Sequence, residues 1–327
     1  SELPNDATYG GNTDNEYTQK FGKQQGKYYV PQRAAAGLDP WATPQAYDNA
    51  KDFFDTGITW SNSLNVAQML DKSSYSISLG NTHQDGIISS TGMDRYNVKV
   101  SADTKLTNNW SSGFTANYIT TSIDKAVTSG NGLLRTVYAA PPSYDLAGIP
   151  SHVDGNPYTQ NSFRGSFDNA YWAMENNKFT EDTNRFFGNV YASYQTDFGT
   201  TNHKLNAKYM VGVDAYTTHY VDSYGYGSNT GGGRGQIENY GWTNATYNSL
   251  LTINYDWRIN EDWGLNAVLG NEIIQSNRKK YYEYGTNYNF PGWNHINNAT
   301  TQQTEEETWK NRTVGFFGNV SASYKNM

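Results

Sequence analysis

Hydrophobic and polar residues alternate one by one over long stretches of this chain. Every second residue of 243–257 and of 263–273 is mostly apolar, aromatic or small, and a short polar segment, 258–262, separates the two stretches. The residues in between are mostly polar, as at Asn254 and Asn266. Because successive side chains of a strand point to opposite faces, this pattern predicts a hairpin with one apolar and one polar face.

Two features of the hairpin favour a membrane-spanning pair of strands. Each arm is long, and about ten residues at about 3.3 Å each cross a hydrocarbon layer when the strand is tilted. Trp257 and Trp263 flank the turn, where a bilayer interface accommodates amphipathic rings. A soluble antiparallel sheet with one wet face is the alternative that the hairpin alone leaves open.

The same alternation recurs along the rest of the chain. Residues 1–60 are polar and contain Pro31, Pro40 and Pro44, so we expect an irregular segment there that leads into a β domain at 61–327. Within that domain the pattern predicts strands near 62–70, 73–82, 94–104, 110–121, 183–196, 204–220, 236–257, 263–280 and 307–325.

Short and long connections alternate between these predicted strands. The short ones lie near 71–72, 105–109, 196–203 and 258–262, and the long ones near 83–93, 122–182, 222–235 and 281–306. Bacterial outer-membrane barrels have short periplasmic turns and long extracellular loops in this order. Aromatic residues also gather beside the short turns and predict an interfacial girdle: Trp110, Tyr194, Phe198, Trp257, Trp263 and Tyr324.

The predicted fold is therefore an all-β, antiparallel transmembrane barrel. Nine strands are an odd number, whereas closed bacterial barrels have an even number, so we expect part of a larger barrel. The alternation assigns one set of side chains to lipid and a second set to the lumen. The lipid set is Val98, Val100, Phe114, Val190, Val211, Leu251 and Leu265, and the lumen set is Asn117, Asn189, Asn254 and Asn266.

The composition agrees with a barrel and excludes several other classes. The mean hydropathy is -0.79 and no stretch approaches the roughly 18 apolar residues of a spanning helix, yet aromatic residues make up 15% of the chain. The chain has no cysteine, which excludes disulfides and thiolate metal sites. A net charge of -7 argues against nucleic acid as a partner.

Several short motifs resemble the SusC/RagA-type TonB-dependent transporters of the bacterial outer membrane. They occur in the order expected for that family and span most of residues 37–326. They include Gly37-Leu38-Asp39-Pro40-Trp41, Phe53-Phe54-Asp55-Thr56-Gly57, Tyr75-Ser76-Ile77-Ser78-Leu79-Gly80, Ala140-Pro141-Pro142-Ser143-Tyr144-Asp145, Asn156-Pro157-Tyr158 and Asn184-Arg185-Phe186-Phe187-Gly188-Asn189.

The resemblance implies a barrel of about 22 strands that contains an N-terminal plug and is energised by TonB from the periplasm. It also implies a SusD-like surface lipoprotein as a partner and a glycan or peptide as the imported nutrient. Neither a plug and TonB-contacting segment nor the later strands are recognisable in these 327 residues. We therefore expect this chain to be a partial barrel. A surface or adhesive β protein that binds a ligand through its loops is the alternative function.

No catalytic or cofactor site emerges from the sequence, and we expect no enzyme activity, cofactor or metal. The five histidines form neither an HxH nor an HExxH pattern, and the Gly-rich segment 231–235 lacks the Lys-Ser/Thr of a phosphate loop. A long connection without strands is usually functional, which draws attention to 122–182 and its aromatic residues.

Contact with a ligand or lid protein is predicted for aromatic residues of the long loops. A lumen lined by Asn, Thr and Ser would supply little binding area, whereas well-placed rings contribute about 0.5–1.5 kcal/mol each. The alternative is that these rings form the private core of a compact loop. The predicted contact residues are Tyr171, Trp172, Tyr226 and Trp293.

Overall fold

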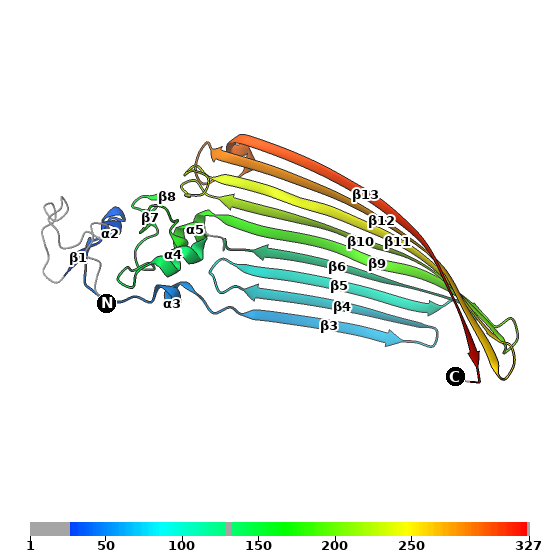
Figure 1. Cartoon of the computed structure of the whole chain (residues 1–327). Helices are drawn as coiled ribbons and strands as arrows, with labels where there is room; N and C mark the ends of the chain where they lie inside the picture. The colour runs from blue at the N-terminus through cyan, green and yellow to red at the C-terminus, as the bar shows by residue number, and fades with distance from the viewer. Residues whose placement is uncertain (1–26, 128–131, 326–327) are drawn as a thin grey trace.

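The chain forms one wide antiparallel sheet with a layer of loops and short helices at one end (Figure 1). This computed structural model describes residues 27–127 and 132–325. The sheet has nine strands in the order β13-β12-β11-β10-β9-β6-β5-β4-β3. They are β3 (Thr59–Met69), β4 (Ser73–Asp85), β5 (Gly92–Lys105), β6 (Trp110–Asp124), β9 (Lys178–Thr196), β10 (His203–Tyr224), β11 (Gln236–Arg258), β12 (Trp263–Tyr288) and β13 (Ala299–Tyr324).

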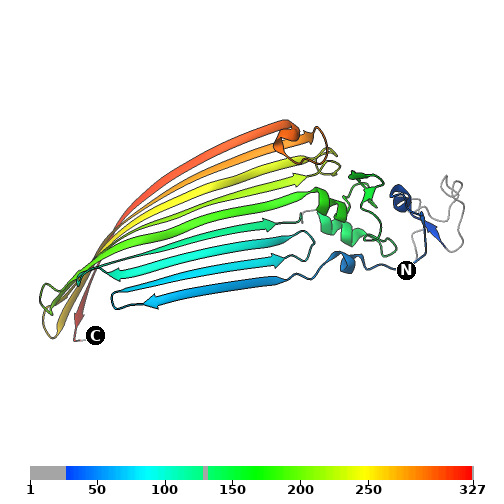
Figure 2. The same cartoon turned by 180° about the vertical axis from the view of Figure 1, so that it is seen from behind.

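All nine predicted strands are confirmed, but most of them are longer than predicted at the loop end. β12 continues to Tyr288, for example, and β13 already begins at Ala299. In these extensions both faces carry many polar residues, so a hydrophobic alternation cannot signal them, while the backbone pairing simply continues. The long connections shrink accordingly to 86–91, 125–177, 225–235 and 289–298. Short turns stay at the opposite end of the sheet (Figure 2).

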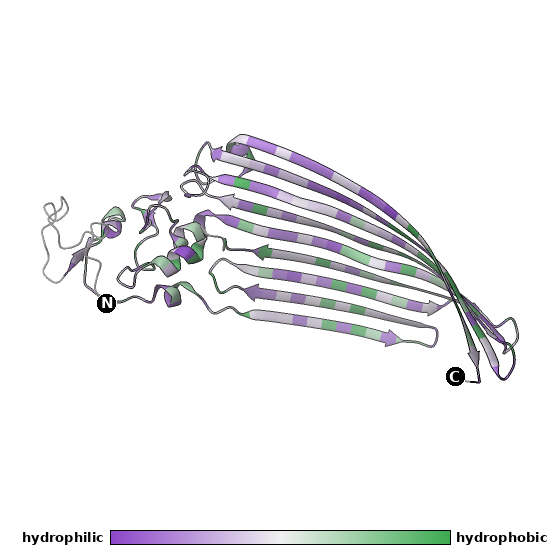
Figure 3. Cartoon of the chain, in the orientation of Figure 1, coloured by the Kyte–Doolittle hydropathy of each residue, from purple (hydrophilic) through white to green (hydrophobic). Residues whose placement is uncertain are grey.

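The register assigns the predicted lipid and lumen sets to opposite faces. Phe114 pairs with Val190, Val190 with Val211, and the remaining lipid-set residues fall on the same face. Asn117, Asn189, Asn254 and Asn266 lie on the other face. We call the two faces the apolar face and the polar face. Hydrophobic positions recur between hydrophilic ones along each strand (Figure 3).

The sheet is curved (Figures 1 and 2), and its polar face carries a shallow hollow. A shallow hollow of about 430 Å³ is lined mostly by polar-face residues, among them Lys99, Asn117, Asn189 and Asn248. Side chains of the apolar face remain solvent-accessible: Leu251 is 37% exposed and Val190 is 53% exposed. The polar face is therefore the concave one, and the apolar face lacks a covering layer among the described residues.

Aromatic side chains gather at the turn end of the apolar face, as predicted. Trp110 packs against Tyr194 with 5.0 Å between ring centroids, and Trp263 packs against Tyr324 at 4.8 Å. Trp257 lies on the same face and stacks on His203 at 5.8 Å. Phe198 lies in the turn 197–202 and is exposed. The position of these rings at a membrane interface stays a prediction.

Residues 27–58 and the connection 125–177 build the layer at the loop end. Its short elements are β1 (Tyr28–Tyr29), α2 (Pro31–Ala35), β2 (Trp41–Ala42), α3 (Asn49–Phe53), α4 (Leu133–Ala139), β7 (His152–Val153), β8 (Asn156–Gln160) and α5 (Ala170–Asn176), and the 3-10 helix η2 (Ile296–Asn298) joins them from the last loop. Residues 1–26 of the predicted irregular segment lie outside the described residues. No helix of residues 27–127 and 132–325 is long and apolar enough to cross a membrane.

A hydrophobic core holds the loop layer together. Buried side chains of the N-terminal segment, such as Val30 and Phe53, pack with Val137 of α4 and with Trp172 of α5. Polar side chains add links across large sequence distances, because Asn161 donates to the carbonyl oxygens of Gln32 and Pro150. The connection 125–177 is therefore a folded unit.

Candidate functional site

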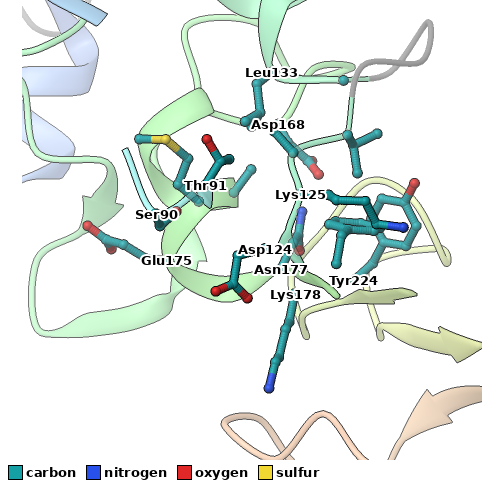
Figure 4. A pocket seen from close by; sticks show the side chains of 16 residues that line it. Ser90, Thr91, Asp124, Lys125, Leu133, Asp168, Glu175, Asn177, Lys178 and Tyr224 are labelled. Atoms are coloured by element: carbon teal, nitrogen blue, oxygen red, sulfur yellow. The ribbon is translucent and has the colours of Figure 1, made fainter. Parts of the chain in front are cut away.

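A cavity of about 460 Å³ lies between the loop layer and the ends of the central strands (Figure 4). Lys125 and Tyr224 lie on one side of it, and Ser90 and Glu175 lie on the other. The end of β6, the helices α4 and α5 and the start of β9 all contribute to its lining. The cavity thus opens where the sheet meets the loops.

Asp168 is the most heavily bonded acid of the cavity lining. Its carboxylate accepts hydrogen bonds from Gln160 Nε2 at 2.8 Å, from Ser228 Oγ at 2.5 Å, and from both the backbone nitrogen and Nδ2 of Asn229 at 2.8 Å. A carboxylate that accepts several hydrogen bonds is held in one orientation. Asp168 therefore ties the connection 125–177 to the loop 225–235 and has little capacity left for a ligand.

Lys125 connects the cavity with the polar face of the sheet. Its ammonium nitrogen lies 3.5 Å from a carboxylate oxygen of Glu181 and 4.6 Å from the ring centroid of Tyr220. Tyr224 also lines the cavity, and its ring meets that of Phe179 edge to face at 5.2 Å. The cavity is thus continuous with the upper part of the polar face, and a ligand in the cavity could also contact that face.

Aromatic rings form a row across the polar face directly below this cavity. We call them the aromatic wall: Tyr216, Tyr220, Tyr240, Trp242, Tyr282 and Trp309. Tyr220, Tyr240 and Tyr282 are direct cross-strand neighbours on β10, β11 and β12. The ring centroids of Tyr220 and Tyr240 are 4.8 Å apart with nearly parallel planes, and those of Tyr240 and Tyr282 are 6.4 Å apart. Trp242 packs against Tyr220 at 5.6 Å.

Guanidinium groups cover the lower edge of the aromatic wall. Arg278 lies over the rings of Trp242 and Trp309, at 5.2 Å and 5.5 Å. Arg185 lies 5.7 Å from the ring of Tyr216 and forms two hydrogen bonds with Asp214, at 2.8 Å and 2.5 Å. Cation–π contacts of this kind favour guanidinium on ring faces and leave its N–H groups free at the edge.

The sequence reasoning missed the aromatic wall, and the expectation of a lumen with little binding area is wrong for the upper polar face. The signal was present, because Tyr216, Tyr220, Tyr240, Trp242 and Tyr282 all occupy even-numbered positions on strands whose polar face is even-numbered. The sequence pattern alone does not show which rings lie at the same level of the sheet. Only the pairing of β10 with β11 and of β11 with β12 brings Tyr220 and Tyr282, which are 62 positions apart, into one row.

Two of the predicted contact residues lie in α5. Trp172 is completely buried, and its Nε1 donates to the carbonyl oxygen of Pro157 at 2.9 Å. The contact role predicted for Trp172 does not fit this structure, because the ring belongs to the core of the loop layer. Tyr171 packs edge to face on Phe53 at 5.4 Å, and burial raises the pKa of its hydroxyl.

The other two predicted contact residues lie in separate loops. Tyr226 packs beside a small cluster that includes the buried Ile237 and Tyr288. Trp293 is 44% exposed and stacks on His295 at 5.0 Å and on Phe290 at 5.8 Å. Tyr171, Tyr226 and Trp293 all belong to the loop end of the molecule, and a contact with a ligand or lid stays a prediction for them.

No group of three or more metal-binding side chains occurs among residues 27–127 and 132–325. The chemistry available at the loop end is therefore that of rings, hydroxyls, carboxylates and cationic side chains. Such groups can bind and orient a ligand through hydrogen bonds, ionic contacts and ring contacts.

The arrangement is similar to that of the RagAB peptide importer. Its closed-closed structure aligns with 96% of this chain at 15% identity and a TM-score of 0.67, and its open-open structure aligns with 96% at 14% identity and a TM-score of 0.66. A structure of the RagAB peptide transporter aligns with 86% of this chain at 15% identity and a TM-score of 0.65.

These likenesses show the fold. The aligned part is 36% of the RagAB importer chain and 32% of the transporter chain, so this chain spans about a third of their length. The prediction of an antiparallel sheet that is part of a larger barrel is confirmed at this level. The RagAB structures are described as those of a peptide importer and a peptide transporter, and that activity is a property of those proteins. No family model matches the chain, and no curated protein matches it.

Proposed function

We propose that this chain forms part of the wall of a bacterial outer-membrane transporter that imports a polar nutrient. The observation that carries this proposal is the continuous apolar band on the convex face of the sheet, opposite a polar concave face. On β10 the band covers residues 205–215, which is about 34 Å along the strand and about 26 Å in height at a tilt of about 40°. Outer-membrane barrels have an apolar band of about 25 Å.

The band explains why large apolar side chains lie uncovered. In water, an apolar surface that extends over nine strands would drive association, since monomeric soluble proteins rarely expose large contiguous apolar patches. Lipid removes that cost, and every backbone group between neighbouring strands is already paired, as a membrane requires. The polar face then lines the lumen, and the loop layer lies at the cell surface.

A finer proposal follows from the resemblance to SusC/RagA-type transporters and from the likeness to RagAB. We infer that the parent protein takes up a glycan or a peptide, receives energy from TonB, and pairs with a SusD-like lipoprotein at the loop end. Tyr171, Tyr226 and Trp293 belong to that end, and the exposed stack of Trp293 on Phe290 and His295 is the surface that best suits a lid protein.

Uptake by bacteria that produce the intact parent protein tests this function. Cells receive labelled oligopeptides or oligosaccharides, and accumulation inside the cell is measured with and without a protonophore. Energised import predicts accumulation that disappears when the protonophore is present and when the gene is deleted. Ligand that binds to the cell surface, with no accumulation in either condition, would contradict transport and support the adhesive alternative.

A further inference from the structure

Two pairs of like charges lie on the polar face, one above and one below the three neighbouring tyrosines Tyr220, Tyr240 and Tyr282. Asp222 and Glu238 are direct cross-strand neighbours on β10 and β11, and we call them the acidic pair. Arg278 and Lys280 are two residues apart on β12, on the same face, and we call them the basic pair. The acidic pair lies towards the loops, and the basic pair lies towards the membrane band.

Neither pair is neutralised by an ion pair. Within residues 27–127 and 132–325, no carboxylate lies within 4.0 Å of the Arg278 or Lys280 cation, and no cation lies that close to Asp222 or Glu238. Asp222 accepts one hydrogen bond, from the hydroxyl of Tyr240 at 3.0 Å. Directly opposed like charges such as Asp222 and Glu238 destabilise a sheet, so an ammonium there would relieve repulsion. Arg278 and Lys280 are neighbours along one strand. Glu307 of β13 lies directly opposite Lys280 on the same face but forms no ion pair with it within 4.0 Å, so both cations can still contact a carboxylate.

Several ring faces of the aromatic wall are covered. Tyr220 and Tyr240 are nearly parallel and cover each other, and Arg278 covers Trp242 and Trp309. Sugar recognition by stacking needs an uncovered ring face. The hydroxyls of Tyr220, Tyr240 and Tyr282 add hydrogen-bonding groups that suit an extended polar chain.

We propose that the aromatic wall binds a short zwitterionic peptide, with its α-ammonium group at Asp222 and Glu238 and its α-carboxylate at Arg278 and Lys280. The proposal deepens the proposed function, on which it rests for the route by which a peptide reaches the wall. It selects peptide over glycan as the ligand class and specifies the direction in which the peptide lies.

The spacing of the pairs sets the length of the peptide. Glu238 pairs with Tyr284 on β12, and Tyr284 lies four positions from Lys280 and six positions from Arg278 along that strand. At about 3.3 Å per residue this corresponds to about 13–20 Å along the strand. An extended peptide of about four to six residues covers the same distance. Shorter peptides would reach only one pair.

Binding to the purified intact protein in detergent tests the proposal without any transport step. The probes are a peptide of about five alanine and serine residues with free termini, its N-acetylated form, its C-amidated form and a neutral maltooligosaccharide of similar length. We expect the peptide with free termini to bind about tenfold tighter than either blocked form, since each terminus loses one charge-assisted contact. The maltooligosaccharide should bind more weakly than all three peptides.

Charge-removing variants locate each end of the peptide. With Arg278→Gln plus Lys280→Gln, the advantage of a free carboxylate over the amidated form should vanish while the advantage of a free amine remains. Asp222→Asn plus Glu238→Gln should have the opposite effect. Lys279→Gln is the matched control, because Lys279 lies on the opposite face and pairs with Glu306 at 2.8 Å. The thermal stability of all three variant proteins is first compared with that of the unmodified protein, to show that each one folds.

Three results would overturn the proposal. Equal affinity for free and blocked peptides would remove the role of the charges. An unchanged preference in both double variants would move the site elsewhere, and tighter binding of the maltooligosaccharide would favour a glycan. Terminus-dependent binding in detergent with no uptake in cells would refute the proposed function and leave the site intact. Uptake in cells that is unchanged in the variants of the aromatic wall would refute the binding site and leave the proposed function intact.

Discussion

An arginine at Leu251 is the sharpest test of the membrane band. Leu251 lies on the apolar face of β11, pairs with Tyr209 and Asn271, and is 37% exposed. It is midway between Ala245 and Trp257, the two ends of the band on this strand. Trp257 is thus about 20 Å away along the strand and about 15 Å away in height at a tilt of about 40°.

This height is about half the thickness of a hydrocarbon layer of about 30 Å, so residue 251 would lie near the midplane of the bilayer. We expect Leu251→Arg to lower the free energy of unfolding from lipid by about 2–4 kcal/mol, because a guanidinium at that depth must leave water or deform the bilayer. The measurement is a denaturant titration of the intact protein in lipid vesicles, followed by tryptophan fluorescence.

Leu250→Arg is the matched control because it replaces a neighbouring leucine on the opposite face. Leu250 pairs with Met210 and Glu272 on the polar face, where a new guanidinium meets a carboxylate and water. We expect its effect to stay within about 1 kcal/mol. A Leu250→Arg protein that is less stable than the Leu251→Arg protein would reverse the assignment of the two faces and refute the reasoning.

Further predictions concern close packing and the loop layer. A Cβ on Gly188 would lie 2.2 Å from the carbonyl oxygen of Thr115, whereas one on Gly165 would meet nothing within 4 Å; Gly188→Ala should therefore cost about 1–3 kcal/mol in the same titration and Gly165→Ala about 0.5 kcal/mol or less. Trp172→Ala should destabilise the loop layer by about 3–5 kcal/mol and make it sensitive to limited proteolysis; an unchanged cleavage rate would contradict its core role. If a SusD-like lipoprotein covers the loop end as proposed, Trp293→Ala should leave cleavage unchanged but weaken co-purification of that lipoprotein. Normal co-purification would exclude the Trp293 ring from the contact surface.

The sequence by itself determined the strands and their two faces. A strand repeats every two residues, so the side of the sheet on which Val190 or Leu251 lies depends only on local alternation. The same is true of the short turns, since polar segments such as 258–262 interrupt the pattern. The resemblance to SusC/RagA-type transporters agrees with the fold-level likeness to RagAB.

Only the tertiary structure decided the features that depend on distant residues. The upper part of β13 carries polar residues on both faces, so nothing local distinguishes strand from loop there, and pairing with β12 settles it. Trp172 has the sequence surroundings of a surface aromatic residue, but contacts with the N-terminal segment bury it. The aromatic wall exists because the register of two successive hairpins, β10–β11 and β11–β12, aligns Tyr220, Tyr240 and Tyr282. The alternation of apolar and polar residues determines the face of the sheet on which a side chain lies. Its level relative to side chains of other strands depends on the hydrogen-bond register between those strands.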